Sequence, residues 1–221
     1  MVTKLPVTIT SIILAGGKST RLGREKALEK IGGESLIERV IGRVAPLSTE
    51  VILVMRPQQP TLSVPAQPKV KAVTDLYPGK GSLGGIYTGL HYSSSFHNLV
   101  VACDMPFLNE ALLRHLIELS PDFDVVIPLV EGNTEPLHGI YSKNCLAPIE
   151  ALLKQGKLRI VDFFPSVRVR YIDVGEVDRF DPQHLSFFNI NTEEDLAKAT
   201  ILAEKEAHQG SIVHNLKETT L

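Results

Sequence analysis

A glycine-rich segment with basic residues is the part of the sequence best suited to binding phosphate. Residues 14–26 read Leu-Ala-Gly-Gly-Lys-Ser-Thr-Arg-Leu-Gly-Arg-Glu-Lys. Gly16 and Gly17 let a ligand approach the backbone closely, so that bare amides point at its phosphate oxygens. Arg21 and Lys26 supply charge-assisted contacts to the same oxygens. The alternative is a strand-to-helix turn with solvated basic side chains, and the spacing matches neither a Walker A loop nor a dinucleotide fingerprint.

Two aspartates that each follow an apolar segment are candidate ligands for a metal ion. Asp75 comes after residues 69–74, and Asp104 comes after residues 98–103. Mg²⁺ binds one or two protein carboxylates together with substrate phosphates and water. A carboxylate at a strand's end, beside a phosphate-binding loop, suits that role. Capping of the next helix explains Asp104 equally well, and loop capping is the better default for Asp75.

The apolar pattern predicts the elements that would position these residues. Segments 9–15, 50–55 and 98–103 are apolar on both faces, as in parallel strands covered by helices. The remaining expected strands are 69–74, 124–128, 136–142 and 167–174, and the expected helices are 35–44, a helix ending at 93, 110–119, 146–155, 158–164 and 192–208. This alternation predicts an α/β fold with a mostly parallel sheet flanked by helices. Such sheets bind ligands beyond the carboxyl ends of their strands, where the glycine-rich loop and both aspartates fall.

Length and composition limit the class of protein. The chain has 221 residues, of which 43% are hydrophobic, and a formal net charge of −2. This predicts a single domain over 1–221, with a folded core at about 8–205 and a frayed C-terminal tail. The charge balance excludes a general nucleic-acid-binding surface, and two cysteines exclude a disulfide scaffold. Because the sequence shows no signal peptide and no apolar run near the ~20 residues of a membrane helix, we expect a cytoplasmic protein without a membrane partner.

Other polar residues carry weaker signals. His138 lies in an expected strand, where a histidine is more often structural than functional. Cys103 is flanked by apolar residues and is expected to be inert core. Asn189 and Asn191 precede an expected helix, so turn formation and capping explain them without a ligand.

Together the motifs resemble the sugar-nucleotidyltransferase-like enzymes and, more narrowly, the molybdenum cofactor guanylyltransferases. The resemblance begins with the loop at 14–26 and continues in Gly-Ser-Leu-Gly-Gly at 81–85 and Cys-Asp-Met-Pro-Phe at 103–107. It extends to Glu-Pro-Leu-His at 135–138 and to Phe-Asn-Ile-Asn-Thr-Glu-Glu-Asp-Leu at 188–196, so it covers roughly residues 9–200. One departure is visible: family members often carry an Asn near the end of the second strand, where this chain has Leu53, Val54 and Met55.

The resemblance implies a Rossmann-like nucleotidyltransferase fold and a set of site residues. It implies that Lys26, Arg21 and Asp104 carry catalysis and that Asp104 binds Mg²⁺. It places GTP against Leu14, Ala15, Gly16, Gly17, Lys26, Asp75 and Asp104. It places the acceptor substrate near Gly81, Gly84, His138, Asn189 and Asn191.

The resemblance also implies a reaction. GMP passes from GTP to molybdopterin and pyrophosphate leaves. The partners are then GTP and molybdopterin, with molybdoenzymes or cofactor-carrier proteins as further partners. A phosphate nucleophile is already ionised at pH 7, which agrees with the lack of a convincing general base in the sequence. Two alternatives stay open: a related nucleotidyltransferase that uses CTP or a sugar phosphate, and a non-catalytic protein that binds a nucleotide or pterin. Related cytidylyltransferases tend to carry Ala-Ala-Gly at the glycine loop, so Gly16 and Gly17 favour GTP over CTP.

Overall fold

A mixed sheet forms the centre of the protein, in a computed structural model that describes residues 7–16, 26–58 and 69–218. The strands are β1 (Ile9–Leu14), β4 (Glu50–Met55), β5 (Val70–Thr74), β6 (His97–Ala102), β7 (Val125–Val130), β8 (Asn133–Thr134), β9 (His138–Ser142) and β10 (Val169–Ile172). Along the sheet they lie in the order β10-β7-β9-β6-β1-β4-β5, and β8 pairs with β7. All pairings are parallel except those of β8 and β9. The predicted α/β fold with a mostly parallel sheet is therefore confirmed.

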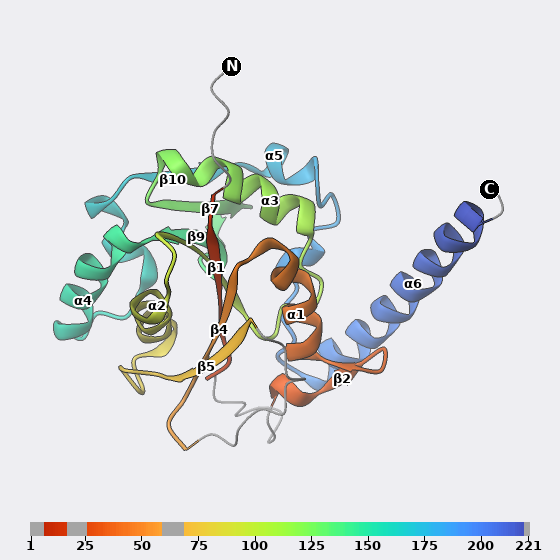
Figure 1. Ribbon diagram of the computed structural model, residues 1–221, viewed down its shortest axis with the longest axis horizontal. Helices are drawn as coiled ribbons and strands as arrows, with labels where there is room; N and C mark the ends of the chain where they lie inside the picture. The colour runs from red at the N-terminus through yellow and green to blue at the C-terminus, as the bar shows by residue number, and fades with distance from the viewer. Residues whose placement is uncertain (1–6, 17–25, 59–68, 219–221) are drawn as a thin grey trace.

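Helices cover both faces of this sheet. One apolar layer contains α1 (Leu36–Val44) and α3 (Glu110–Leu119), and the other contains α2 (Gly81–Tyr92) and α4 (Leu146–Lys154). Figure 1 shows α2 and α4 together on one side of the strands, with α1 on the other. The last helix, α6 (Glu193–Glu218), begins beside β2 (Lys30–Ile31) and extends away from the body of the molecule (Figure 1). No helix in the part of the chain described here has the length and apolar character needed to cross a membrane.

Local signals in the sequence place several helix boundaries correctly. At the start of α1, the Ser35 hydroxyl accepts from the Glu38 amide, and the Glu38 carboxylate accepts from the Ser35 amide. Together these two hydrogen bonds form a capping box, which the Ser-x-x-Glu spacing of Ser35 and Glu38 favours. At the start of α3, Asn109 accepts from the Leu112 amide in the same way. Strand β4 and helix α3 have the predicted bounds.

The second half differs from the sequence prediction in three places. The expected helix at 158–164 is a 3₁₀ helix over Ile160–Ser166, which contains Pro165. The expected strand at 167–174 ends at Ile172, because Asp173 caps a short helix, α5 (Val174–Asp178). Helix α6 continues past the expected end near 208 to Glu218.

A short hairpin between the first loop and α1 was not predicted. It pairs β2 with β3 (Glu34–Ser35) through Gly32 and Gly33, whose φ angles are +58° and +89°. Such angles suit a two-residue turn in which glycine avoids steric strain. The expected proline-rich loop at 56–68 lies mostly outside the described residues.

Helix α2 packs unusually close to the sheet because glycines form its inner face. A methyl group added at Gly85 would lie 3.0 Å from Leu14 Cδ2, and one added at Gly89 would overlap the Ile12 side chain. A methyl group at Gly84 would lie 2.9 Å from the Tyr77 carbonyl oxygen. Gly85 and Gly89 therefore set the distance between α2 and β1, and Gly84 allows the loop before α2 to pack against the helix.

His138 lies at the start of β9 and is completely buried. Its ring centroid is 5.0 Å from that of Phe187, and neither ring nitrogen has a hydrogen-bond partner among the described residues. Burial lowers the pKa of His138 from 6.5 to about 4, although the Asp181 carboxylate opposes the shift. The side chain thus stays neutral in the folded protein at any pH above about 4. Cys103 and Cys145 are also buried and form no disulfide, and for Cys103 this agrees with the expected core position.

Replacing Gly89 with alanine is expected to destabilise the protein by about 2 kcal/mol, because the new methyl group overpacks the α2–β1 contact. The matched control is Gly42→Ala on α1, where an added methyl group meets nothing within 4 Å. There the better helix propensity should stabilise the protein by up to about 1 kcal/mol. Urea unfolding of both variants measures the contrast, and equal effects would contradict the packing argument.

His138→Leu should make the protein less sensitive to acid. The unfolded chain takes up a proton at this position below its ordinary pKa of 6.5, whereas the folded protein does so only near 4. Stability therefore falls as the pH falls from about 6.5 to about 4, and at pH 5 the loss is about 2 kcal/mol. Urea unfolding at pH 7.5 and pH 5.0 should show this loss in the wild type and a smaller one in the variant. An identical pH dependence in both proteins would contradict the buried neutral state.

Candidate functional site

The carboxyl ends of four adjacent strands bring the predicted site residues to one edge of the sheet. The Ala15 amide donates to the Val54 carbonyl at 2.9 Å, and the Cys103 amide donates to the Leu14 carbonyl at 3.2 Å. The Asp75 amide donates to the Met55 carbonyl at 2.7 Å. Backbone pairing therefore continues just beyond β6, β1, β4 and β5. It fixes the positions from which the glycine-rich loop and the two aspartates begin.

Lys26, Asp104 and Asn191 form one contact cluster at this edge. The Lys26 Nζ lies 2.6 Å from Asp104 Oδ2 and 2.9 Å from Asn191 Oδ1. The pairs are 78 and 165 residues apart in the sequence. From the resemblance, Lys26 and Asp104 are expected at the nucleotide and Asn191 at the acceptor. In the structure Lys26 contacts both Asp104 and Asn191, which no spacing in the sequence indicated.

Asp104 has the properties of a cation ligand. Its side chain is 20% exposed, and the backbone fixes it because its carbonyl accepts from the Ile190 amide at 3.1 Å. Its second oxygen, Oδ1, is buried and finds no hydrogen-bond partner within the described part of the chain. A buried carboxylate oxygen without a partner is unfavourable, and a bound cation would satisfy it. Asp104 therefore fits the expected Mg²⁺, and the residues described contain no cluster of three acidic, histidine or cysteine side chains that would offer a second metal centre.

The turn that leads into α6 presents Asn191. The Asp195 carboxylate accepts from the amides of Asn191 and Thr192, both at 2.9 Å, and the Asp195 amide donates to the Thr192 hydroxyl. These hydrogen bonds lower the pKa of Asp195, with the Asn191 amide as the largest cause. Thr192 and Asp195 thus form a capping box at the start of α6, and the Asn191 side chain is left to accept from Lys26. Asn189 instead donates to the Phe187 carbonyl at 3.0 Å, within its own turn.

Asp75 organises the loop before α2. Its Oδ1 accepts from the Tyr77 amide at 3.0 Å and from the Thr88 hydroxyl at 2.8 Å. This is the loop-capping role that the sequence favoured for it. Gly81, with a φ of +62°, forms the turn into the helix, and Gly84 allows the close contact with Tyr77. The structure thus gives Asp75, Gly81 and Gly84 positions that shape the loop.

The first loop is only partly described. A methyl group at Gly16 would lie 3.1 Å from the Arg56 amide nitrogen, so glycine is needed where the chain leaves β1 beside the end of β4. Leu14 packs into the α2 layer, and Ala15 is buried in the opposite one. Gly17 and Arg21 lie outside the described residues. His138, which the sequence placed near the acceptor, is buried beneath Phe187.

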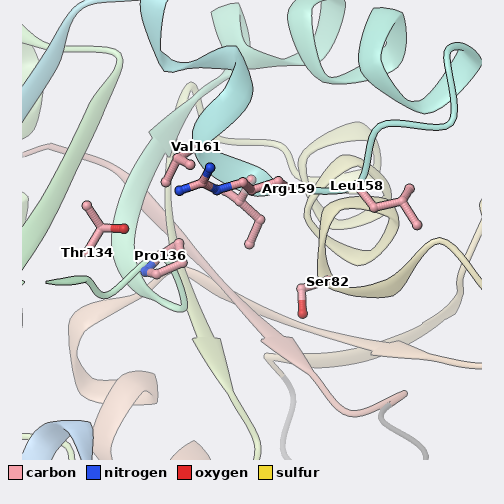
Figure 2. Close-up of a pocket in the computed structure, with 7 residues that line it drawn as sticks. Ser82, Thr134, Pro136, Leu158, Arg159 and Val161 are labelled. Atoms are coloured by element: carbon pink, nitrogen blue, oxygen red, sulfur yellow. The ribbon is translucent and has the colours of Figure 1, made fainter.

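A cavity of about 330 Å³ opens between the start of α2, β8 and the 3₁₀ helix. It is lined by Ser82, Thr134, Pro136, Leu158, Arg159, Ile160 and Val161. Figure 2 shows the Arg159 side chain in the middle of this group, with Ser82 and Thr134 presenting their hydroxyls below it. Burial raises the pKa of Glu135, which lies between two of the lining residues. Arg159 was not predicted as a site residue, because a single arginine between Leu158 and Ile160 belongs to no recognisable motif.

The cavity and the Lys26–Asp104 pair lie near the same strand ends. Pro136 precedes β9, whose first residue His138 pairs with Val101 near the end of β6. Ser82 lies in the first turn of α2, shortly after the end of β5. The edge thus combines one carboxylate, one ammonium group, a loop with glycines and a partly apolar cavity with a guanidinium group. This combination suits a phosphate-bearing substrate and a second ligand with an apolar body.

Comparison with known proteins identifies the family. The MobA-like NTP transferase domain matches residues 11–167. A probable molybdenum cofactor guanylyltransferase from Pelotomaculum thermopropionicum is 39% identical over 195 residues, which cover 88% of this chain and 93% of that protein. The molybdenum cofactor guanylyltransferase of Desulfosudis oleivorans is 37% identical over 193 residues, which cover 86% of this chain and 94% of that protein.

A solved structure agrees with the sequence comparisons. Molybdopterin-guanine dinucleotide biosynthesis protein A from Archaeoglobus fulgidus superimposes with a TM-score of 0.76 at 30% identity, covering 89% of this chain and 99% of that chain. The family match spans more than half of the sequence and includes β1, β6 and β9. The chain therefore belongs to the MobA-like NTP transferases, a nucleotidyltransferase family, and resembles the molybdenum cofactor guanylyltransferases within it.

Proposed function

We propose that this protein transfers GMP from GTP to molybdopterin, releasing pyrophosphate and forming the guanine dinucleotide. The observation that carries the proposal is the contact of Lys26 with Asp104 at the end of β6. A lysine for phosphate and a carboxylate for a cation lie side by side where the glycine-rich loop begins. The relatives named molybdenum cofactor guanylyltransferase support the choice of substrates.

Charge neutralisation by the protein carries most of the proposed catalysis. Asp104 would hold Mg²⁺, which when bound neutralises charge on the triphosphate. Lys26 would bind the phosphates of the nucleotide, together with Arg21 and the amides that follow Leu14. The reaction then needs positioning and electrostatic stabilisation more than proton transfer.

The acceptor phosphate needs no general base because it is already ionised at pH 7. One of its oxygens forms a bond to the α-phosphorus of GTP. The bond from that phosphorus to the bridging oxygen breaks, and pyrophosphate leaves with the electron pair. No group among the described residues has to remove a proton in this step.

The nucleotide and acceptor would occupy different parts of the edge. Gly16 lets the chain leave β1 close to the Arg56 backbone, and Asp75 holds the neighbouring loop in shape on the nucleotide side. We place the acceptor in the cavity around Arg159. Asn189, Asn191 and the buried His138 do not line this cavity, and their role toward the acceptor rests on the resemblance alone. Arg159 offers a planar cation for a phosphate or for the face of a pterin ring. Molybdoenzymes or cofactor-carrier proteins are the proposed partners that receive or deliver the cofactor.

The proposed reaction is tested by product analysis. Purified protein with Mg²⁺, molybdopterin and equal amounts of GTP and CTP should form mainly the guanine dinucleotide and pyrophosphate, detected by mass spectrometry. A cytosine dinucleotide as the main product would show that CTP is the substrate, and nucleotide binding without any product would favour a non-catalytic role.

Asp104→Asn tests the metal ligand. The variant keeps the shape of the side chain but removes its charge, so the rate should fall by about 100-fold, an electrostatic loss of a few kcal/mol. Near-normal turnover by the variant would show that Asp104 does not bind the metal ion.

Arg159→Ala tests the acceptor cavity. The variant should raise the KM for molybdopterin about tenfold and leave the KM for GTP within about twofold, because the loss of a charge-assisted contact affects only the ligand in that cavity. Arg114→Ala is the matched control, since Arg114 is an exposed arginine on α3, across the sheet from the cavity. An equal change in both KM values would show that the cavity does not select the acceptor.

A further inference from the structure

The Lys26 ammonium group already occupies the carboxylate that the proposed function gives to a metal ion. It lies 2.6 Å from Asp104 Oδ2, and both side chains are mostly buried, with exposed fractions of 14% and 20%. An ion pair that is partly removed from water is stronger than a surface pair and less screened by salt. The positive charge that Asp104 needs is therefore supplied from within the chain.

The two oxygens of Asp104 differ in their partners. Oδ1 is buried and without a partner among the described residues, whereas Oδ2 carries the contact with Lys26. Because both oxygens belong to one carboxylate, a cation bound to either of them lies close to the Lys26 ammonium group. Like charges at such a separation repel each other. A divalent cation therefore binds this carboxylate less tightly while Lys26 holds it.

A nucleotide offers Lys26 a second set of partners. The lysine begins a single 3₁₀ turn, Lys26–Leu28, directly after the phosphate-binding loop, and its four-carbon chain can swing. It also contacts the neutral amide oxygen of Asn191 at 2.9 Å. Phosphate oxygens carry negative charge and bind an ammonium group more strongly than an amide does.

We propose that Lys26 is an internal counter-cation of Asp104 that a divalent cation replaces only when a nucleotide supplies phosphates for the displaced ammonium group. The inference rests on the proposed function and adds how its two ligands depend on each other. A metal ion alone then binds weakly, because it must displace Lys26 without giving it a new partner. Metal and nucleotide promote each other's binding, and this coupling is reciprocal.

Binding of Mn²⁺ to the nucleotide-free, full-length protein tests the proposal, with free Mn²⁺ followed by electron paramagnetic resonance. Lys26→Met should bind Mn²⁺ about tenfold more tightly than the wild type, because it removes the competing charge. Lys26→Arg keeps the charge and should bind as weakly as the wild type. Lys30→Met, which removes an exposed lysine of β2, controls for a change in net charge and should leave the affinity unchanged.

Three results would overturn the inference: Lys26→Met binds Mn²⁺ no more tightly than the wild type, Lys30→Met gains as much as Lys26→Met, or Asp104→Asn leaves Mn²⁺ binding unchanged. Should Lys26→Met melt at a much lower temperature, Lys26→Gln replaces it, since its amide still donates to oxygen without carrying charge. Product formation by the wild type is measured on the same preparation. If the wild type forms product but Lys26→Met binds Mn²⁺ no more tightly, the proposed function stands and the counter-cation role is rejected. If the wild type forms no product but Lys26→Met binds Mn²⁺ more tightly, only the proposed function is rejected.

Discussion

The pairing of β1 with a parallel strand on each side is the constraint on which the site depends. Leu14 is in register with Val54 on one side and with Ala102 on the other. The loop after β1 and Asp104 after β6 therefore start from the same level of the sheet. A shift of one residue in this register would turn the side chains of β1 to the opposite layers, exchanging Ile12 with Ile13. The position of the Lys26–Asp104 contact is thus fixed by hydrophobic packing more than by the charges themselves.

The sequence predicts those parts of the fold whose information is local. Segment 51–55 is continuously apolar, Ser35 and Glu38 have the spacing of a capping box, and each feature predicts one element directly. The same holds for Asp75, whose loop-capping role follows from its position before a glycine turn. The resemblance to a known family adds the identity of the loop residues, which periodicity alone does not give.

Features that depend on contacts distant in sequence could not be predicted in this way. Asn191 lies 165 residues from Lys26, and no periodicity relates the two. The Arg159 cavity is made by the start of α2 and two segments of the second half. In one of these, 3₁₀ geometry replaces the expected helix because Pro165 and short turns interrupt the pattern. The burial of His138 likewise depends on Phe187, which comes from a different segment. The sequence indicates which residues are polar, whereas tertiary packing decides which of them face a ligand.

The reversed direction of β9 has a consequence for how such a protein can diverge. Because β9 runs against its neighbours, the segment that precedes it lies at the same edge as the segments that follow β1 and β6. The chain between β7 and β9 therefore reaches this edge without being connected to the segments that follow β1 and β6. Substitutions or insertions there alter the cavity wall at Thr134 and Pro136 and leave the parallel strands undisturbed. If the cavity holds the acceptor as proposed, selection on the acceptor and selection on the nucleotide act on separate stretches of polypeptide, so that one specificity can drift while the other is retained.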